Sequence, residues 1–287
     1  MSPVRSGCKL IYIPGTGGEE IALDDVDSAL VGVAEDLRSY EWHYSVEASS
    51  LDAASRLARE SAVSCWMRRG ASEPALLSFE ADIEAGTPGT LVSGEWTQRA
   101  YVPKASLSRI NPDGSVSAGL TVVLLDGVWR RETTYQLLPN SGREMDNETL
   151  DYPHDYGHDY GTSSVSGVTV DVPGVTPCDL RLRVYGYAVS PYVRIGGNTY
   201  QVNVTVPDGA ILTVDTTRKG SMLGDSVTLR GLYGDVADVF SKRLRGAKGS
   251  GSYIYELVQP GPQAVSWPQS FGVDVTLIER RGGLPWT

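Results

Sequence analysis

The segment Leu150–Gly161, which reads LDYPHDYGHDYG, limits the possible architecture more than any other stretch of the chain. It has no apolar face at the helical or the strand period, so no hydrophobic core can bury one side of it. Polar segments of this kind join domains. We therefore predict a linker at residues 150–161, between a first domain at residues 1–149 and a second domain at residues 150–287. The length of 287 residues, longer than most single domains, agrees with this division.

Strand patterns dominate the first domain, and the 32 glycines and 15 tyrosines of the chain also favour strands and turns. Apolar residues alternate from Val116 to Leu124, as expected for a strand with one buried face. We expect strands at Lys9–Ile13, Thr90–Val92, Trp96–Lys104, Val116–Leu125 and Trp129–Leu137. One helix is predicted at Pro74–Ala85, because proline favours a helix start and Gly86 follows as a stop.

Two segments of the first domain are harder to assign. Tyr40, Trp42 and Tyr44 alternate as in a half-buried strand, and large aromatic residues on one face predict a core position. The segment Ala53–Met67 fits either a helix or a strand, and we favour a strand.

Short strands at regular spacing, separated by turns, are typical of a β-sandwich in the second domain. The expected strands are Ser166–Val172, Leu180–Val189, Tyr192–Ile195, Tyr200–Val206, Ala210–Thr216, Tyr253–Val258 and Phe271–Ile278. The last two are expected to be joined through residues 260–268. One amphipathic helix is predicted at Asp235–Gly246 from the spacing of Val236, Val239, Phe240 and Leu244. The predicted fold class is mainly β, with one helix in each domain.

The acidic charge argues against nucleic-acid and anionic-membrane binding. The formal net charge is −10, and residues 1–150 carry 13 Lys and Arg against 22 Asp and Glu, whereas residues 151–287 carry 12 against 13. The acid excess therefore lies in the first half. No signal peptide is expected, because no apolar segment follows Arg5 near the N-terminus, and no membrane span is expected, because no run of about 18 apolar residues occurs.

The linker also holds the strongest candidate metal site. Carboxylate and imidazole side chains recur there every four residues, and a helix would align Asp151, His154, Asp155 and His158 for a divalent metal and a hydrolase reaction. Pro153 and Gly157 disfavour that helix, so the prediction is a tyrosine-lined linker with no metal. We predict no catalytic residue, no cofactor-binding residue and no enzyme activity.

Two further features could indicate a functional site, namely a phosphate-binding loop and reactive cysteines, but we predict a structural role for both. The loop Pro14–Gly18 contains GTGG, but Glu19 and Glu20 follow it where a phosphate loop needs lysine and Ser/Thr, so a turn is predicted. Cys8, Cys65 and Cys178 are widely spaced with no CxxC, which indicates reduced, buried thiols.

Six short sequence motifs occur in a characteristic order and span almost the whole chain. They are Leu37–Tyr44 (LRSYEWHY), Gly94–Tyr101 (GEWTQRAY), Leu124–Trp129 (LLDGVW), Leu150–Tyr156 (LDYPHDY), Gln259–Trp267 (QPGPQAVSW) and Arg280–Trp286 (RRGGLPW). Through the order and the total of these motifs, the chain resembles the distal tail protein family of long non-contractile-tailed bacteriophages and their prophages.

The resemblance implies a first domain that assembles into a hexameric ring and a galectin-like second domain that projects outward. It implies a hub at the virion tail tip, made in the host bacterial cytoplasm, that joins the tail tube to tail-associated adsorption proteins. Genomic DNA would pass through the ring without specific binding, and a channel wall built from the acidic half would repel its phosphates. No catalytic or binding residue carries over from the family.

A host-surface carbohydrate-binding module is the alternative function. A β-sandwich with aromatic residues that we expect to be exposed, at Tyr185, Tyr187, Tyr192 and Trp267, motivates it. A galectin-type site is not expected, because such a site uses His, Trp and Glu and none of these occurs between Ser166 and Thr217.

Overall fold

The computed structural model describes residues 10–23, 30–33, 39–68, 72–112, 114–139, 167–219 and 225–284. The chain divides into two compact units, the first formed by residues 1–131 and 280–287 and the second by residues 132–279. The predicted linker at residues 150–161 lies outside the described residues, so the domain ranges 1–149 and 150–287 remain a prediction. The sequence left open which domain the last strands join. The final strand runs within the second unit up to Glu279 and returns to the first unit at Arg280.

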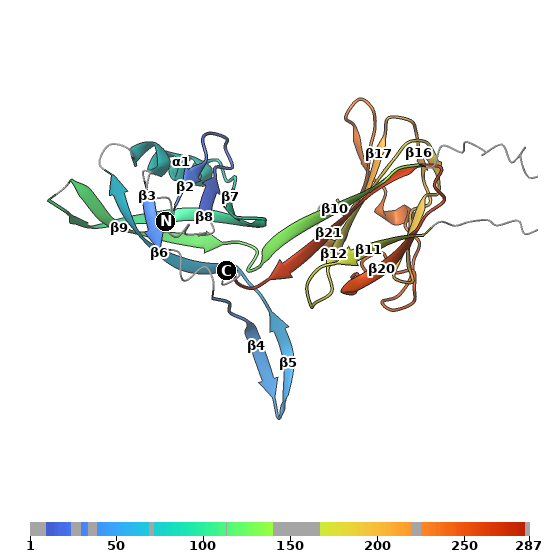
Figure 1. Cartoon of the computed structure of the whole chain (residues 1–287), viewed down its shortest axis with the longest axis horizontal. Helices are drawn as coiled ribbons and strands as arrows, with labels where there is room; N and C mark the ends of the chain where they lie inside the picture. Colours follow the sequence, from blue (N-terminus) through green and yellow to red (C-terminus); the bar gives the residue numbers. More distant parts are fainter. Residues whose placement is uncertain are drawn as a thin grey trace, which may run out of the picture. The chain divides into compact units, whose positions relative to one another are not determined.

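The first unit is built on one antiparallel sheet with the strand order β2-β1-β7-β8-β9-β6-β3 (Figure 1). The strands are β1 (Leu10–Ile13), β2 (Ile21–Ala22), β3 (Leu30–Val33), β6 (Arg59–Arg68), β7 (Gly89–Ser93), β8 (Trp96–Ile110) and β9 (Ser115–Leu124). Every second residue of β9 from Ala118 to Leu124 is buried, as the alternation predicted. The segment left open at residues 53–67 forms strands.

Helix α1 (Glu73–Glu84) confirms the predicted helix of the first unit. Pro74 lies in its first turn, where the missing N–H costs nothing, and Gly86 follows its end with a positive φ of 64°. The helix packs against β8 and buries Phe79, whose ring meets Tyr12 of β1 edge to face at 5.0 Å. Gly89 makes room for this pair, since a Cβ there would lie 2.2 Å from the Tyr12 ring.

A hairpin of β4 (His43–Glu47) and β5 (Ser50–Ser55) extends away from this sheet, on the side opposite to α1 in Figure 1. Every residue of both strands is exposed. The prediction that Tyr40, Trp42 and Tyr44 face a core is therefore wrong. The alternation correctly indicated a strand at Tyr44, but the side chain is 66% exposed instead of buried.

The second unit is a β-sandwich. One sheet has the order β19-β18-β17-β12-β21-β10 and the other β11-β20-β14-β15, with a separate pair of β13 and β16. The strands are β10 (Trp129–Leu137), β11 (Val168–Val172), β12 (Asp179–Tyr185), β13 (Ala188–Val189), β14 (Tyr192–Ile195), β15 (Asn198–Gln201), β16 (Thr205–Val206), β17 (Ile211–Asp215), β18 (Val227–Arg230), β19 (Val236–Asp238), β20 (Gly261–Ser266) and β21 (Gly272–Arg281). β10 and β21 each contribute a few residues to the first unit.

Both sheets contribute to one hydrophobic core, in which Leu180, Val214 and Val275 meet Val170, Val193 and Val265. The mainly β fold class and the sandwich are thereby confirmed. Tyr200, Val202 and Val206 are buried on one side as predicted, but their segment divides into β15 and β16. No helix in the described residues is both long and apolar enough to span a bilayer.

The predicted helix at Asp235–Gly246 is wrong. Residues Val236–Asp238 form β19 beside β18, and Phe240–Lys242 form a single 3₁₀ turn. The backbone groups that a helix would use internally are bonded elsewhere: Asn203 N donates to Lys242 O, and Leu244 N donates to Gln201 O. Tertiary pairing thus overrides the helical spacing of the apolar residues.

The end of the chain also differs from the expectation. Tyr253–Val258 is an irregular segment whose Val258 makes one isolated bridge with Cys178. The predicted connection at residues 260–268 instead contains β20, which pairs with β11 and β14. Residues 271–278 are a strand as predicted, within β21.

Candidate functional site

The predicted candidates for metal binding, Asp151, His154, Asp155 and His158, lie outside the described residues. Among the residues that the structure describes, no three His, Cys, Asp or Glu side chains gather closely enough to hold a metal ion. Cys65 and Cys178 are buried thiols, as the sequence predicted, and burial raises the pKa of Cys65 to about 11.

The loop after β1 holds one of the protein's own carboxylates. Its backbone N–H groups at Gly15 and Thr16 donate to Asp82 of α1 at 3.1 and 2.9 Å, and the Thr16 hydroxyl donates at 2.8 Å. Tyr12 donates to the same side chain at 2.7 Å. Burial acts to raise the pKa of Asp82, but these hydrogen bonds outweigh it and hold the pKa below its usual value. The amides that suggested a phosphate loop therefore secure α1 to β1.

The aromatic residues proposed for carbohydrate binding do not form one exposed set. Trp267 is only 6% exposed, and its indole N–H donates to the Phe271 carbonyl at 3.1 Å, so its predicted exposure is wrong. Tyr185 packs beside Gly272, where a Cβ would lie 2.1 Å from its ring. Tyr187 and Tyr192 remain exposed. A stacking platform for sugar rings is therefore reduced to two tyrosines.

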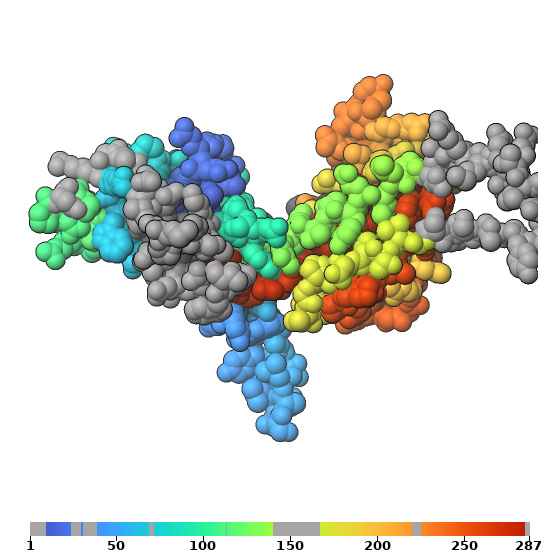
Figure 2. Space-filling model, in the orientation of Figure 1, coloured from blue at the N-terminus to red at the C-terminus, as the bar shows by residue number. Residues whose placement is uncertain are grey.

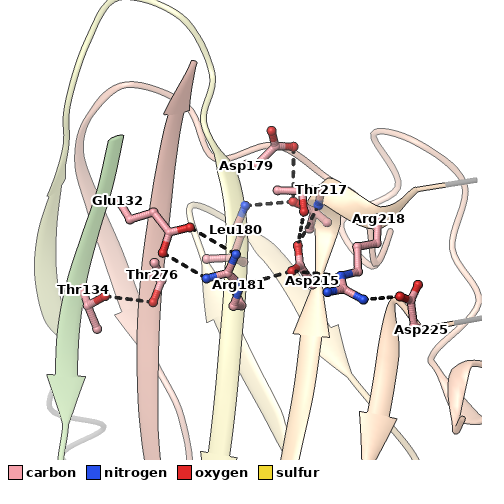
Figure 3. A network of polar contacts seen from close by, with 11 residues as sticks. Glu132, Thr134, Asp179, Leu180, Arg181, Asp215, Thr217, Arg218, Asp225 and Thr276 are labelled. Carbon is pink, nitrogen blue, oxygen red and sulfur yellow. Dashed lines mark hydrogen bonds and ion pairs between the residues drawn. The ribbon is translucent and has the colours of Figure 1, made fainter. Parts of the chain in front are cut away.

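A chain of ion pairs crosses the larger sheet of the sandwich (Figure 3). Arg181 of β12 contacts Glu132 of β10 at 2.9 Å and Asp215 of β17 at 3.1 Å. Arg218 lies 3.7 Å from Asp215 and pairs with Asp225. The Arg181–Asp215 pair joins the neighbouring strands β12 and β17, and the Arg181–Glu132 pair reaches across β21 to β10, so the network holds the strands of this sheet together.

The β4–β5 hairpin presents an exposed apolar surface on the first unit. Tyr44, Val46 and Leu51 are 66%, 62% and 61% exposed. Figure 2 shows the hairpin as a narrow projection of this unit. Exposed apolar groups gathered on one element mark an interaction surface.

Contacts at its base fix where the hairpin leaves the first unit. Arg59 of β6 donates to the Ser39 carbonyl at 2.8 Å. The guanidinium of Arg56 lies 4.1 Å from the centre of the Trp42 ring, a cation–π contact. The Leu57 carbonyl fits against Gly127, where a Cβ would lie 2.4 Å from its oxygen. The hairpin is therefore anchored at its base.

A second apolar surface lies on the same unit, between α1 and the outer half of β8. A groove of about 400 Å³ is lined by Phe79 and Ile83 of the helix and by Val102 and Leu107 of the strand. Beyond Val102 every residue of β8 is exposed, including Leu107 at 68% and Ile110 at 78%. This groove and the hairpin are the two candidate contact surfaces of the first unit.

Comparison with known proteins finds the same fold in phage hub and baseplate proteins. No protein-family model and no curated protein matches the chain. Among solved structures it is similar to the SPP1 Dit (gp 19.1) protein, a paradigm of the hub adsorption apparatus in phages that infect Gram-positive bacteria. That match has 12% identity and a TM-score of 0.54, and covers 94% of this chain and 99% of the other.

A chain of the phage P2 baseplate in its activated conformation with Ca is also similar, with 10% identity and a TM-score of 0.53 over 96% of this chain and 99% of the other. The same baseplate with Sr gives a TM-score of 0.52 at 10% identity. At these identities the likeness is one of fold. The chain has the fold of these phage hub and baseplate proteins, which confirms the resemblance inferred from its sequence.

Sequence reasoning missed both candidate surfaces. The alternation at Tyr40–Tyr44 identified an amphipathic strand but assigned its apolar side to the core. Nothing in Lys104–Ile110 indicated full exposure. The one available signal was Pro103, since proline within a strand indicates an edge or a bulge, and the register of β8 against β9 does shift between Tyr101 and Lys104.

Proposed function

We propose that this protein is a structural subunit of a phage or prophage tail tip, a hub that joins the tail tube to adsorption proteins. The observation that carries the proposal is the fold match with the SPP1 Dit protein over 94% of this chain and 99% of that one. Because the match extends over nearly the full length of both chains, it includes both units and not a common sandwich alone. The similarity to a baseplate chain supports the same role.

The proposed assembly is a hexameric ring formed by the predicted first domain, residues 1–149, with the galectin-like domain, residues 150–287, projecting outward. Exposed apolar surfaces on the first unit support self-association. The role is structural and not enzymatic, and its location is the virion tail tip after synthesis in the host bacterial cytoplasm.

We further propose that DNA passes through the ring without specific binding. The excess of 22 acidic over 13 basic residues in positions 1–150 supports a channel wall that repels phosphates. A ring structure with a channel lined by Lys and Arg would contradict this part of the proposal.

The oligomeric state tests the central proposal. Size-exclusion chromatography with light scattering and negative-stain imaging of the full chain should show closed rings, alone or with the tail tube and adsorption proteins from the same genome. A strict monomer under both conditions would contradict a hub function.

A further inference from the structure

Four basic residues lie close together in one segment of the second unit. Residues 239–255 contain no Asp or Glu but have Lys242, Arg243, Arg245 and Lys248. A helix at Asp235–Gly246 would place these cations near its carboxyl end, where the helix dipole favours them, but the segment is not a helix. Arg243 has a structural role, since its guanidinium lies 3.6 Å from the centre of the Phe240 ring and donates to the Phe240 carbonyl at 2.9 Å. The other three need a different explanation.

Those three cations are exposed. In the part of the chain that the structure describes, the side chains of Lys242, Arg245 and Lys248 form no ion pair. Unneutralised charges of one sign on one surface raise the local concentration of ligands with the opposite sign. The chain as a whole has a net charge of −10, so this segment is a local exception that favours an anionic partner.

The basic segment lies along β15, the edge strand of the smaller sheet. Leu244 N donates to the Gln201 carbonyl, and Thr199 N donates to the Gly251 carbonyl, each at 2.8 Å. Residues 245–250 form a loop between these two contacts, so both ends of the loop are fixed to the same strand. The loop therefore holds two of the three exposed cations beside the β14–β15 turn.

A pocket of about 280 Å³ lies between this loop and the β14–β15 turn. Glycines of the turn and of the loop line it, and Ile195, Leu257 and Val258 add apolar surface. Glu256 supplies a carboxylate, whose Oε2 accepts the Gly249 N–H at 2.9 Å. The volume is close to the lower end of the roughly 300–1,000 Å³ of ligand pockets, so it suits a single sugar ring.

Hydrogen bonds hold the Glu256 side of the pocket in place. Its carbonyl accepts the Tyr200 hydroxyl at 2.8 Å, and its N–H donates to the Tyr253 carbonyl at 3.1 Å. The buried Asn198 side chain donates to the same carbonyl at 3.0 Å and accepts from Tyr253 N at 3.1 Å. A site that is ordered beforehand loses less conformational entropy when a ligand binds.

The carboxylate and the cations together indicate the class of ligand. Glu256 accepts hydrogen bonds from hydroxyl groups and repels anions, so the negative charge of a ligand must lie outside the pocket, beside the loop. DNA lacks the 2′-hydroxyl that could donate to this carboxylate. Residues 245–252 (RGAKGSGS) have no large apolar side chain to insert into a membrane. An acidic polysaccharide offers both hydroxyl groups and negative charges.

We propose that the pocket and the loop beside it form a binding site for an acidic polysaccharide. One sugar ring enters the pocket and donates hydroxyl hydrogen bonds to Glu256, and Arg245 and Lys248 pair with anionic groups on the neighbouring sugars. The pocket lining includes none of the aromatic residues considered above for carbohydrate binding. This binding activity is additional to the hub role and does not depend on ring assembly.

Biolayer interferometry with the full-length protein tests the site. The probes are polygalacturonate and alginate, two acidic polysaccharides, and the comparison ligands are neutral dextran, double-stranded DNA and phosphatidylglycerol vesicles. The wild type should bind at least one acidic polysaccharide at about 0.05 M salt and release it as salt rises, because salt screens the cations. Dextran, DNA and vesicles should bind at least about tenfold more weakly.

Neutralising the loop should weaken this binding. Arg245→Gln/Lys248→Gln should lower the affinity at least about tenfold, because each basic side chain beside an anionic surface contributes about fivefold. The control Arg183→Gln/Arg230→Gln removes the same charge at exposed positions of the larger sheet and should leave the affinity unchanged. Circular dichroism and thermal melting should match the wild type, since all four side chains are exposed.

Glu256→Gln separates sugar recognition from simple attraction of polyanions. The amide keeps the size of the side chain and an oxygen for the Gly249 N–H but removes the negative charge. If the pocket recognises hydroxyl groups, the affinity should fall at least about threefold, because charged acceptors form stronger hydrogen bonds. If charge alone acts, the loss of a negative charge should raise the affinity.

Three results would overturn the inference. They are no binding of either acidic polysaccharide at low salt, equally tight binding of DNA or vesicles, and a gain of affinity in Glu256→Gln. Each of them leaves the hub proposal standing, because that proposal rests on the fold match and is tested by ring formation.

Discussion

The Tyr12 hydroxyl donates a 2.7 Å hydrogen bond to Oδ2 of Asp82 and so ties β1 to α1 across 70 residues of the chain. Gly15 and Thr16 bond the same carboxylate, which has no exposed surface. The Asp82 side chain therefore closes the loop after β1. It also holds α1 in place, and because α1 forms one wall of the groove, it positions a candidate contact surface.

Replacing Asp82 with Asn should destabilise the first unit. The amide group turns one acceptor into a donor that faces other donors, and unsatisfied buried hydrogen-bonding groups are costly. We expect the free energy of unfolding to fall by about 2–4 kcal/mol, measured by urea denaturation with tryptophan fluorescence. Glu84→Gln, at an exposed position of the same helix, is the control and should change it by no more than about 0.5 kcal/mol. Equal effects from the two variants would contradict this role.

The same carboxylate predicts a loss of stability in acid. Because its folded pKa is lowered, the stabilisation is fully present above the pKa of the unfolded chain, about 3.9 for Asp, and is lost as pH falls through the folded value. The difference in unfolding free energy between the wild type and Asp82→Asn should therefore shrink as pH is lowered from about 6 toward 3. Urea titrations at several pH values measure this, and a constant difference would contradict it.

Alanine substitutions at Gly127 and Gly94 test whether the contact at the base of the hairpin requires a glycine. Both have positive φ, 61° and 58°, so alanine costs about 1 kcal/mol of backbone strain at either position. A Cβ at Gly127 would also lie 2.4 Å from the Leu57 carbonyl oxygen, whereas nothing lies within 4 Å of one at Gly94. Gly127→Ala should therefore lower the free energy of unfolding at least twice as much as Gly94→Ala. Thermal melting of both variants checks this order.

The sequence predicted the elements whose signals are local. Pro74 and Gly86 bracket α1, and the alternation up to Leu124 marks the buried face of β9, because these patterns depend on backbone geometry and a single core. The segment Val236–Asp238 was predicted as helix, because apolar spacing does not reveal that β18 provides a partner for it.

The two candidate contact surfaces could not be predicted, because the sequence of one chain does not show whether an apolar face is covered. The aromatic pattern at Tyr44 shows that a strand has an apolar side, but not whether the same molecule covers it. Asp82 escaped notice for a related reason: a single acid in a helix forms no pattern, and its partners Tyr12 and Thr16 lie 70 and 66 residues away. The only clue was a glycine-rich loop whose amides required an acceptor.

Arg181 should contribute to the stability of the sandwich through its two carboxylate partners. Arg181→Met keeps much of the side-chain volume but leaves Asp215, whose side chain is only 6% exposed, with a single ion pair to Arg218 at 3.7 Å. We expect the free energy of unfolding to fall by about 1–3 kcal/mol, because the largely buried Asp215 carboxylate loses its nearest ion-pair partner and keeps only the longer pair and the hydrogen bonds from Thr217. Urea denaturation measures this, with Arg183→Met at an exposed position of the same strand as the control. In a double-mutant cycle with Glu132→Gln, the two effects should be less than additive, since the residues share a bidentate ion pair; full additivity would mean that this pair contributes nothing.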